Sequence, residues 1–86
     1  MHLRQEFRFL QHDHGGFLMN VISGSCFGVN LIGATIIEII SQGGVDDMDA
    51  LLAILASRHQ GDLERMVEDT RSYVRQLARA GVIELA

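Results

Sequence analysis

The sequence has no proline, no tryptophan and no lysine, and it contains a single cysteine, Cys26. A lone cysteine excludes an internal disulfide and a multi-cysteine zinc site within one chain. In a short apolar segment it is typical of a small core or edge filler rather than of a reactive thiol. The seven basic residues are all arginines, and eleven carboxylates outnumber them, which gives a formal net charge of −4. Because nucleic-acid-binding modules usually present a basic surface, this balance argues against DNA or RNA as a partner.

Long apolar runs are also missing. No stretch reaches the ~20 residues that cross a bilayer, and Glu38 interrupts the most apolar one. The N-terminus lacks the basic-then-apolar order of a signal peptide. We therefore expect a cytoplasmic protein with no membrane partner. Its 86 residues predict one domain over positions 1–86, which is too small to enclose a deep cleft.

The first third of the sequence predicts an antiparallel meander of three strands, over about residues 5–29. Leu3, Phe7 and Phe9 share the alternation of the first strand. Residues 17–22 form a second, mostly buried strand, and residues 26–29 form a short third one. Polar turns at residues 12–16 and 23–25 connect them.

The remainder predicts three helices over about residues 31–80. Asn30 is placed to cap the first helix, and Gly33 in its first turn indicates close approach to a neighbouring backbone. Isoleucines cover most of the circumference of this helix, which is typical of a central, buried element. Gly43 and Gly44 are expected to end it.

Acidic residues mark the starts of the other two helices. Asp46 or Asp47 is expected to cap the second helix, and Asp62 the third. After Gly81, the apolar tail of residues 82–85 is expected to return to the sheet. Three strands followed by three helices predict a small α+β domain of the winged helix-turn-helix type.

The third strand is the segment that most suggests a function. A hairpin on so small a protein leaves a strand edge with little to cover it, and such an edge can pair with another backbone. Phe27 should point to the face opposite Cys26 and Gly28, so that one set enters the core and the other lines a groove. Gly28 has no side chain to obstruct an approaching chain. Since no catalytic constellation competes, we expect a binding protein that is not an enzyme and needs no cofactor.

The order of these elements resembles the PqqD-like proteins, small peptide chaperones of pyrroloquinoline-quinone biosynthesis. The resemblance rests on an apolar strand, a Ser-Gly turn and a short strand that ends in Val29-Asn30. It continues through Ile32-Gly-Ala-Thr-Ile-Ile-Glu-Ile39 and the Gly43-Gly44 pair, and it ends with Leu77-Ala-Arg-Ala-Gly-Val82.

The resemblance implies a RiPP recognition element, which binds the leader segment of a ribosomally made precursor peptide and presents it to modifying enzymes. In that family the leader lies along the third strand, in the groove between this strand and the third helix, here residues 25–29 and 62–79. The implied peptide-binding residues are Ser25, Cys26, Phe27, Gly28, Val29, Arg65, Asp69, Ser72, Tyr73 and Gln76. The sequence looks closer to the free-standing recognition proteins of lasso-peptide pathways, where a separate leader peptidase is the partner.

Several of these side chains also have a purely structural interpretation. Tyr73 borders the apolar stripe of the third helix, so it is either a partly buried core aromatic or a wall of the groove. Arg65 and Asp69 have the i,i+4 spacing of a surface ion pair. His12 and His14 would need a further ligand, such as His2 or His59, to hold a metal, and a solvated turn accounts better for them, so no metal site is expected.

Two other functions fit parts of the pattern. A winged-helix transcription regulator would insert the third helix into DNA, but Glu64, Glu68 and Asp69 would repel phosphate there. An open strand edge can also pair with a second copy of the chain and form a homodimer.

Overall fold

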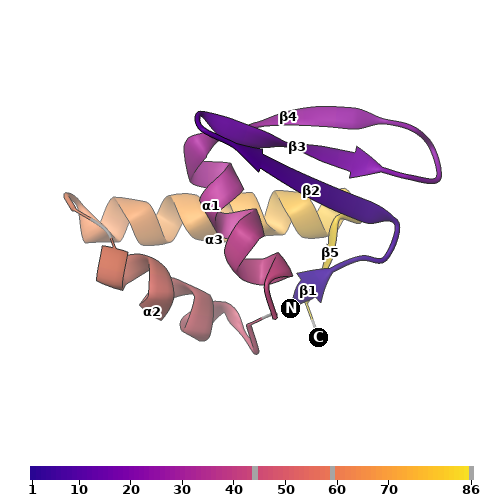
Figure 1. Ribbon diagram of the computed structural model, residues 1–86. Helices are drawn as coiled ribbons and strands as arrows, with labels where there is room; N and C mark the ends of the chain where they lie inside the picture. The colour runs from indigo at the N-terminus through magenta and orange to yellow at the C-terminus, as the bar shows by residue number, and fades with distance from the viewer. Residues whose placement is uncertain (44, 59, 86) are drawn as a thin grey trace.

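The computed structural model describes residues 1–43, 45–58 and 60–85. Five strands and three helices make up this part of the chain (Figure 1). In order they are β1 (His2–Leu3), β2 (Phe7–His12), β3 (Gly15–Asn20), β4 (Cys26–Asn30), α1 (Leu31–Ser41), α2 (Met48–Arg58), α3 (Leu63–Arg79) and β5 (Ile83–Glu84). The predicted α+β meander followed by three helices is therefore confirmed.

Strands β2, β3 and β4 form the antiparallel sheet in sequence order. The turns differ from the prediction, because Gly15 and Gly16 lie inside β3 and not in a turn. A Cβ atom on Gly16 would lie 2.6 Å from the ring of Phe9, so the glycine lets this ring pack across the strand. The second strand is also less buried than predicted, since Phe17 and Met19 are exposed while Leu18 is buried.

Helix α1 is the centre of the fold, as its isoleucines predict. Ile36, Ile37 and Ile40 are almost fully buried, and α1 packs against the sheet on one side and α2 on the other. All three helices lie on one side of the sheet (Figure 1). The opposite face of the sheet is left uncovered.

The helix caps that the sequence predicts are present. The Asn30 side chain accepts a hydrogen bond from the Gly33 amide at 2.8 Å, and Asp47, not Asp46, accepts from the Ala50 amide at 2.9 Å. Asp62 likewise accepts from the Arg65 amide. Gly44, one of the two glycines expected to end α1, lies outside the described residues. No helix in the described part of the chain is long and apolar enough to cross a membrane.

The C-terminal tail corrects two expectations. It does not return to the main sheet; instead β5 pairs antiparallel with β1 in a separate two-stranded sheet. Leu3 therefore belongs to β1, where it pairs with Ile83, and not to the first strand of the meander. The Arg4 side chain reinforces this second sheet through an ion pair with Glu84 at 3.2 Å. Pairing between the first and last strands of the chain, each of two residues, leaves no hydrophobic periodicity in the sequence.

Replacing Ile37 by alanine should lower the free energy of unfolding by about 2–5 kcal/mol, because the side chain is fully buried and its loss leaves a cavity. Ile32→Ala is the matched control on the same helix, where the side chain is 73% exposed, and it should change stability by less than about 0.5 kcal/mol. Urea denaturation monitored by circular dichroism measures both. Equal losses in the two variants would contradict the central position of α1.

Candidate functional site

The outer edge of β4 is one of the two edges of the main sheet at which a further strand can pair, and β2 forms the other. The Asn20 amide donates to the Ser25 carbonyl at 2.9 Å, so these opposed residues form a hydrogen-bonded pair. Such pairs alternate along an antiparallel ladder, and Met19–Cys26 and Phe17–Gly28 are therefore the intervening pairs. The N–H and C=O groups of Cys26 and Gly28 consequently point to the open edge.

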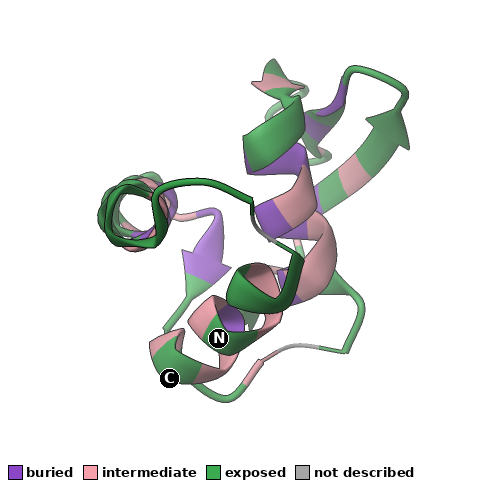
Figure 2. Ribbon diagram, turned by 90° about the vertical axis from the view of Figure 1, so that its left-hand side faces the viewer, coloured by how far each residue is buried: buried purple, intermediate pink, exposed green. Residues whose placement is uncertain are grey.

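The two faces of β4 follow the prediction in part, because Val29 packs against the core from the same face as Phe27, whereas Phe27, Cys26 and Gly28 stay exposed. β4 is exposed along its length except at Val29, which is half-buried (Figure 2). Phe27 lies opposite the buried Leu18, on the face that carries the helices, and it is still 53% exposed. Cys26 and Gly28 lie on the opposite face, so Cys26 is not a core filler but an exposed free thiol.

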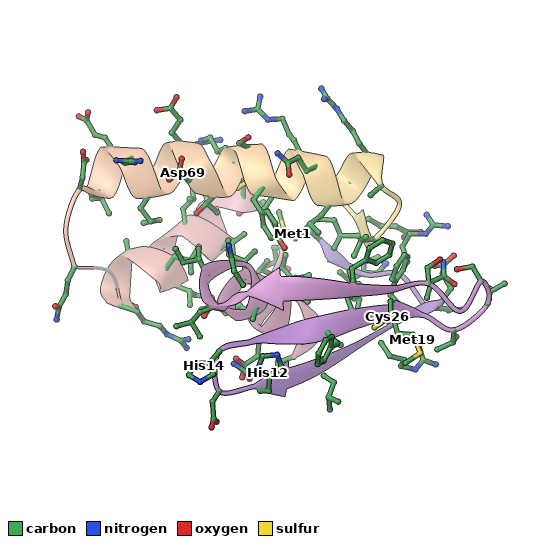
Figure 3. The ribbon with its side chains drawn as sticks, turned by 90° about the horizontal axis from the view of Figure 1, so that it is seen from above. Met1, His12, His14, Met19, Cys26 and Asp69 are labelled. Carbon is green, nitrogen blue, oxygen red and sulfur yellow. The ribbon has the colours of Figure 1, made fainter. Side chains whose placement is uncertain are left out.

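A groove of about 740 Å³ opens between the start of α1, the end of α2 and the first half of α3. Viewed from above, the axis of α3 is roughly parallel to β4 (Figure 3). The apolar lining is formed by Leu31, Ile32, Ile36, Leu55, Met66 and Tyr73. Leu31 and Ile32 are 54% and 73% exposed, which is unusual for large apolar residues on a central helix. The groove therefore offers apolar surface beside the end of the open strand.

Tyr73 connects the groove with β4. A Cβ atom on Gly33 would lie 2.6 Å from the Tyr73 hydroxyl and 2.8 Å from Val29 Cγ1. The tyrosine ring thus packs over the first turn of α1, next to the one half-buried residue of β4. Both interpretations of Tyr73 therefore hold in part, since it is half-buried and it lines the groove. The close approach that Gly33 predicts is present, but the neighbour is a side chain and not a backbone.

Burial also affects the phenol of Tyr73. Desolvation raises the pKa of this group above its ordinary value of 10.0, because it disfavours the charged tyrosinate. No other tyrosine and no tryptophan occurs in the sequence. Tyrosine fluorescence of this protein therefore reports on the groove alone, as does absorbance at wavelengths where phenylalanine does not absorb.

Helix α3 supplies part of the polar lining of the groove. Arg65 and Asp69 form the predicted i,i+4 ion pair, with Nε and Oδ2 3.9 Å apart. Both side chains are mostly exposed, so the pair contributes little to stability. At the base of the groove, the buried Thr70 hydroxyl donates to Met66 Sδ at 3.6 Å. Arg58 and Asp62 also line the groove, which can thus offer charges of both signs to a ligand.

The structure brings part of the predicted site together. Arg65, Asp69 and Tyr73 line the groove, whereas Ser72 and Gln76 are exposed and continue the same side of α3 beyond it. Ser25 immediately precedes β4, and Cys26, Phe27, Gly28 and Val29 belong to it. Sequence reasoning missed the contributions of Leu31, Ile32, Leu55, Arg58 and Met66. Two large apolar residues directly after the Asn30 cap were the signal that could have revealed part of this wall.

The histidines of the first hairpin have no group of further metal ligands beside them among the described residues. Within residues 1–43, 45–58 and 60–85, no three His, Cys, Asp or Glu side chains gather as metal ligands would. The His14 amide donates to His12 Nδ1 at 3.2 Å, and the His12 ring lies 5.2 Å from the Phe17 ring, centroid to centroid. His59, suggested as a further ligand, lies outside the described residues.

Comparisons with known proteins agree with this geometry. The family model of coenzyme PQQ synthesis protein D (PqqD) matches residues 15–83. Among solved structures, "TbiB1 in Complex with the TbiA(beta) Leader Peptide" has a TM-score of 0.80 at 19% identity, covering 98% of this chain and 95% of that one. "Lasso peptide synthetase B1 complexed with the leader peptide" has a TM-score of 0.70 at 25% identity, covering 93% and 92%. A search of curated proteins by sequence found no match.

The Tyr73 phenol should titrate above pH 10 in the folded protein and near 10.0 in the denatured chain. Because the folded state favours the neutral phenol, its contribution to stability is complete below the pKa of the unfolded chain. It is lost as the pH rises through the higher pKa of the folded state. Absorbance at a tyrosinate wavelength, with and without urea, measures both values. Coincident titration curves would contradict the burial of this ring.

Gly33→Ala should destabilise the protein by about 1–3 kcal/mol despite the better helix propensity of alanine, because the new methyl group meets Tyr73 and Val29. Adding Tyr73→Phe removes the nearest atom, the hydroxyl oxygen, so the double variant should recover part of the loss. Thermal denaturation of the wild type and three variants gives the coupling. Additive effects would show that the two residues are not in contact.

Proposed function

The chain belongs to the PqqD family, and from this membership we propose that it binds the leader segment of a ribosomally made precursor peptide without catalysing a reaction itself. The observation that carries the proposal is the open edge of β4 beside an apolar groove. The two structural neighbours support it, because both are described as complexes with a leader peptide. Their fold extends over nearly the whole of this chain.

The peptide adds to β4 as a fourth strand, antiparallel like the other strand pairs of the sheet. Its backbone pairs with the outward N–H and C=O groups of Cys26 and Gly28, which supplies affinity independent of sequence. Alternate peptide side chains face the helices and contact Phe27, Val29 and Tyr73. Ser25 extends the edge at one end, and Arg65, Asp69, Ser72 and Gln76 of α3 provide polar contacts along the helix.

The partner enzyme is a leader peptidase or another modifying enzyme, as in lasso-peptide biosynthesis. The similarity to a lasso peptide synthetase B1 over 93% of this chain supports this pathway over quinone-cofactor biosynthesis. A separate binding protein would hold the leader while the enzyme acts on another part of the precursor. The division of labour fits a domain whose recognition surface lies along one strand edge.

The alternative function, DNA binding by α3, has no supporting observation. Glu64, Glu68 and Asp69 are exposed in the first half of this helix, where they would repel phosphate. The apolar groove lined by Leu31, Ile32 and Tyr73 would have no counterpart in a DNA backbone.

The proposal is tested with peptides selected on the wild-type protein from a displayed random library, together with the TbiA(beta) leader peptide. Binding should shift the amide resonances of Cys26 and Gly28 and change the tyrosine fluorescence of the groove. Peptides that bind without shifting β4, or a failure of every peptide to bind, would contradict strand addition.

N-methylation of the peptide provides a matched control within one ligand. Methylation at the residue opposite Gly28 removes a donor to β4 and should weaken binding about tenfold or more, since a lost buried hydrogen bond costs about 1–3 kcal/mol. Methylation at the next residue, whose amide points away from β4, should change affinity much less. Calorimetric titration compares the two. A Val29→Pro variant would not test peptide pairing, because Val29 pairs with Gly16 in the hydrogen-bonded set and its amide faces β3 and not the open edge.

A further inference from the structure

The face of the sheet opposite the helices is unusually apolar. Leu10 is 70% exposed, Phe17 47% and Met19 44%, and Cys26 lies beside Met19 in the strand register. Met19 and Cys26 lie together at one end of this face (Figure 3). A shallow depression of about 430 Å³ lies over these residues. The proposed contacts with the helix side make no use of this surface.

Arg8 is the charged residue that borders this depression within the described chain. Its Nη1 atom donates to the backbone carbonyls of Gln5 and Phe7, at 2.5 Å and 2.9 Å. The guanidinium group is therefore held by backbone carbonyls at the margin of the depression. The centre of the face stays apolar.

Gly28 leaves a space next to this face, at the edge that receives the peptide. In the strand register Gly28 lies directly opposite Phe17. A Cβ atom on Gly28 would have no heavy atom within 4 Å. Phe17 is consequently open on the side of β4, with no side chain between its ring and the next strand position.

A peptide strand at β4 must place a side chain at this space. The peptide residue opposite Gly28 is the one that exchanges backbone hydrogen bonds with it, and opposed residues of a sheet point to the same face. Neighbouring strands lie about 4.8 Å apart. A large side chain at that peptide position can therefore extend through the space that Gly28 leaves open and reach Phe17.

We propose that the space over Gly28 is a second recognition subsite, which takes one large apolar side chain of the bound peptide and packs it against Phe17. This inference rests on the proposed function, since the same edge must hold the peptide. Continuity with that edge identifies the occupant, because the backbone hydrogen bonds at Gly28 fix the position of the side chain. The protein then contacts side chains on both faces of the peptide strand, one at the subsite and the alternate ones in the groove.

The test is a double-mutant cycle with a peptide selected on the wild type and placed in register by its amide shifts. Replacing the peptide residue opposite Gly28 by alanine should weaken binding about two- to fivefold, the usual size of a cross-strand side-chain contact. Phe17→Ala should cause a similar loss, and the two changes together should cost no more than either alone. Peptides selected on the wild type should also prefer aromatic or branched apolar residues at this position.

Leu10→Ala is the matched control, because Leu10 lies on the same face of the sheet but on the side of Phe17 that is farther from the peptide. The Leu10→Ala variant should bind the peptide with the affinity of the wild type. If peptides shift the Cys26 and Gly28 amides but the Phe17 cycle is additive, the subsite is refuted while strand addition stands. If no peptide shifts these amides, both proposals fall. If Phe17→Ala instead abolishes self-association in sedimentation experiments, a second copy covers this face and the subsite is overturned.

Discussion

The architecture depends on one apolar helix, α1, that packs against both the sheet and the helical layer. Ile36, Ile37 and Ile40 of α1 are buried almost completely, because the main sheet packs on one side of the helix and β1 and α2 also pack against it. All three helices lie on one side of the sheet, so the described residues place no element on its far side (Figure 1). The uncovered sheet face and the open edge of β4 both follow from this arrangement, and they are the surfaces on which the proposed binding depends.

An open edge is a risk that the fold limits by simple means. β4 has only five residues, and Gly28 at its centre weakens pairing that is not reinforced elsewhere. Backbone hydrogen bonds alone therefore give a partner strand little net stabilisation, since they replace bonds to water. A partner must also contact the surfaces beside the edge, which are the groove wall at Tyr73 and the exposed ring of Phe17. The need to contact these neighbouring surfaces would thus both select the partner and protect the edge from unwanted strand pairing.

What the sequence predicts well is chemistry confined to neighbouring residues. The caps at Asn30 and Asp62 depend on hydrogen bonds within one helical turn, so the residue types at these positions are enough to predict them. The groove wall is different, because an apolar residue after a cap looks the same whether or not another element covers it. Leu31 and Ile32 are exposed only because no part of α2 or α3 closes over them. The pairing of β5 with β1 is equally invisible, since two residues are too few to show a period.

The family resemblance predicts a groove on the helix side, but strand geometry requires two faces. A peptide paired with β4 presents alternate side chains to opposite sides. The helices cover one of these sides, and on the other side Phe17 and Gly28 determine what a peptide meets. Of the two sets of side chains that a peptide strand would present, the outward set would therefore meet Phe17 and not α3. A large apolar residue packed on Phe17 would keep that side of the peptide ordered, so that the strand stays in register while the rest of the precursor is processed.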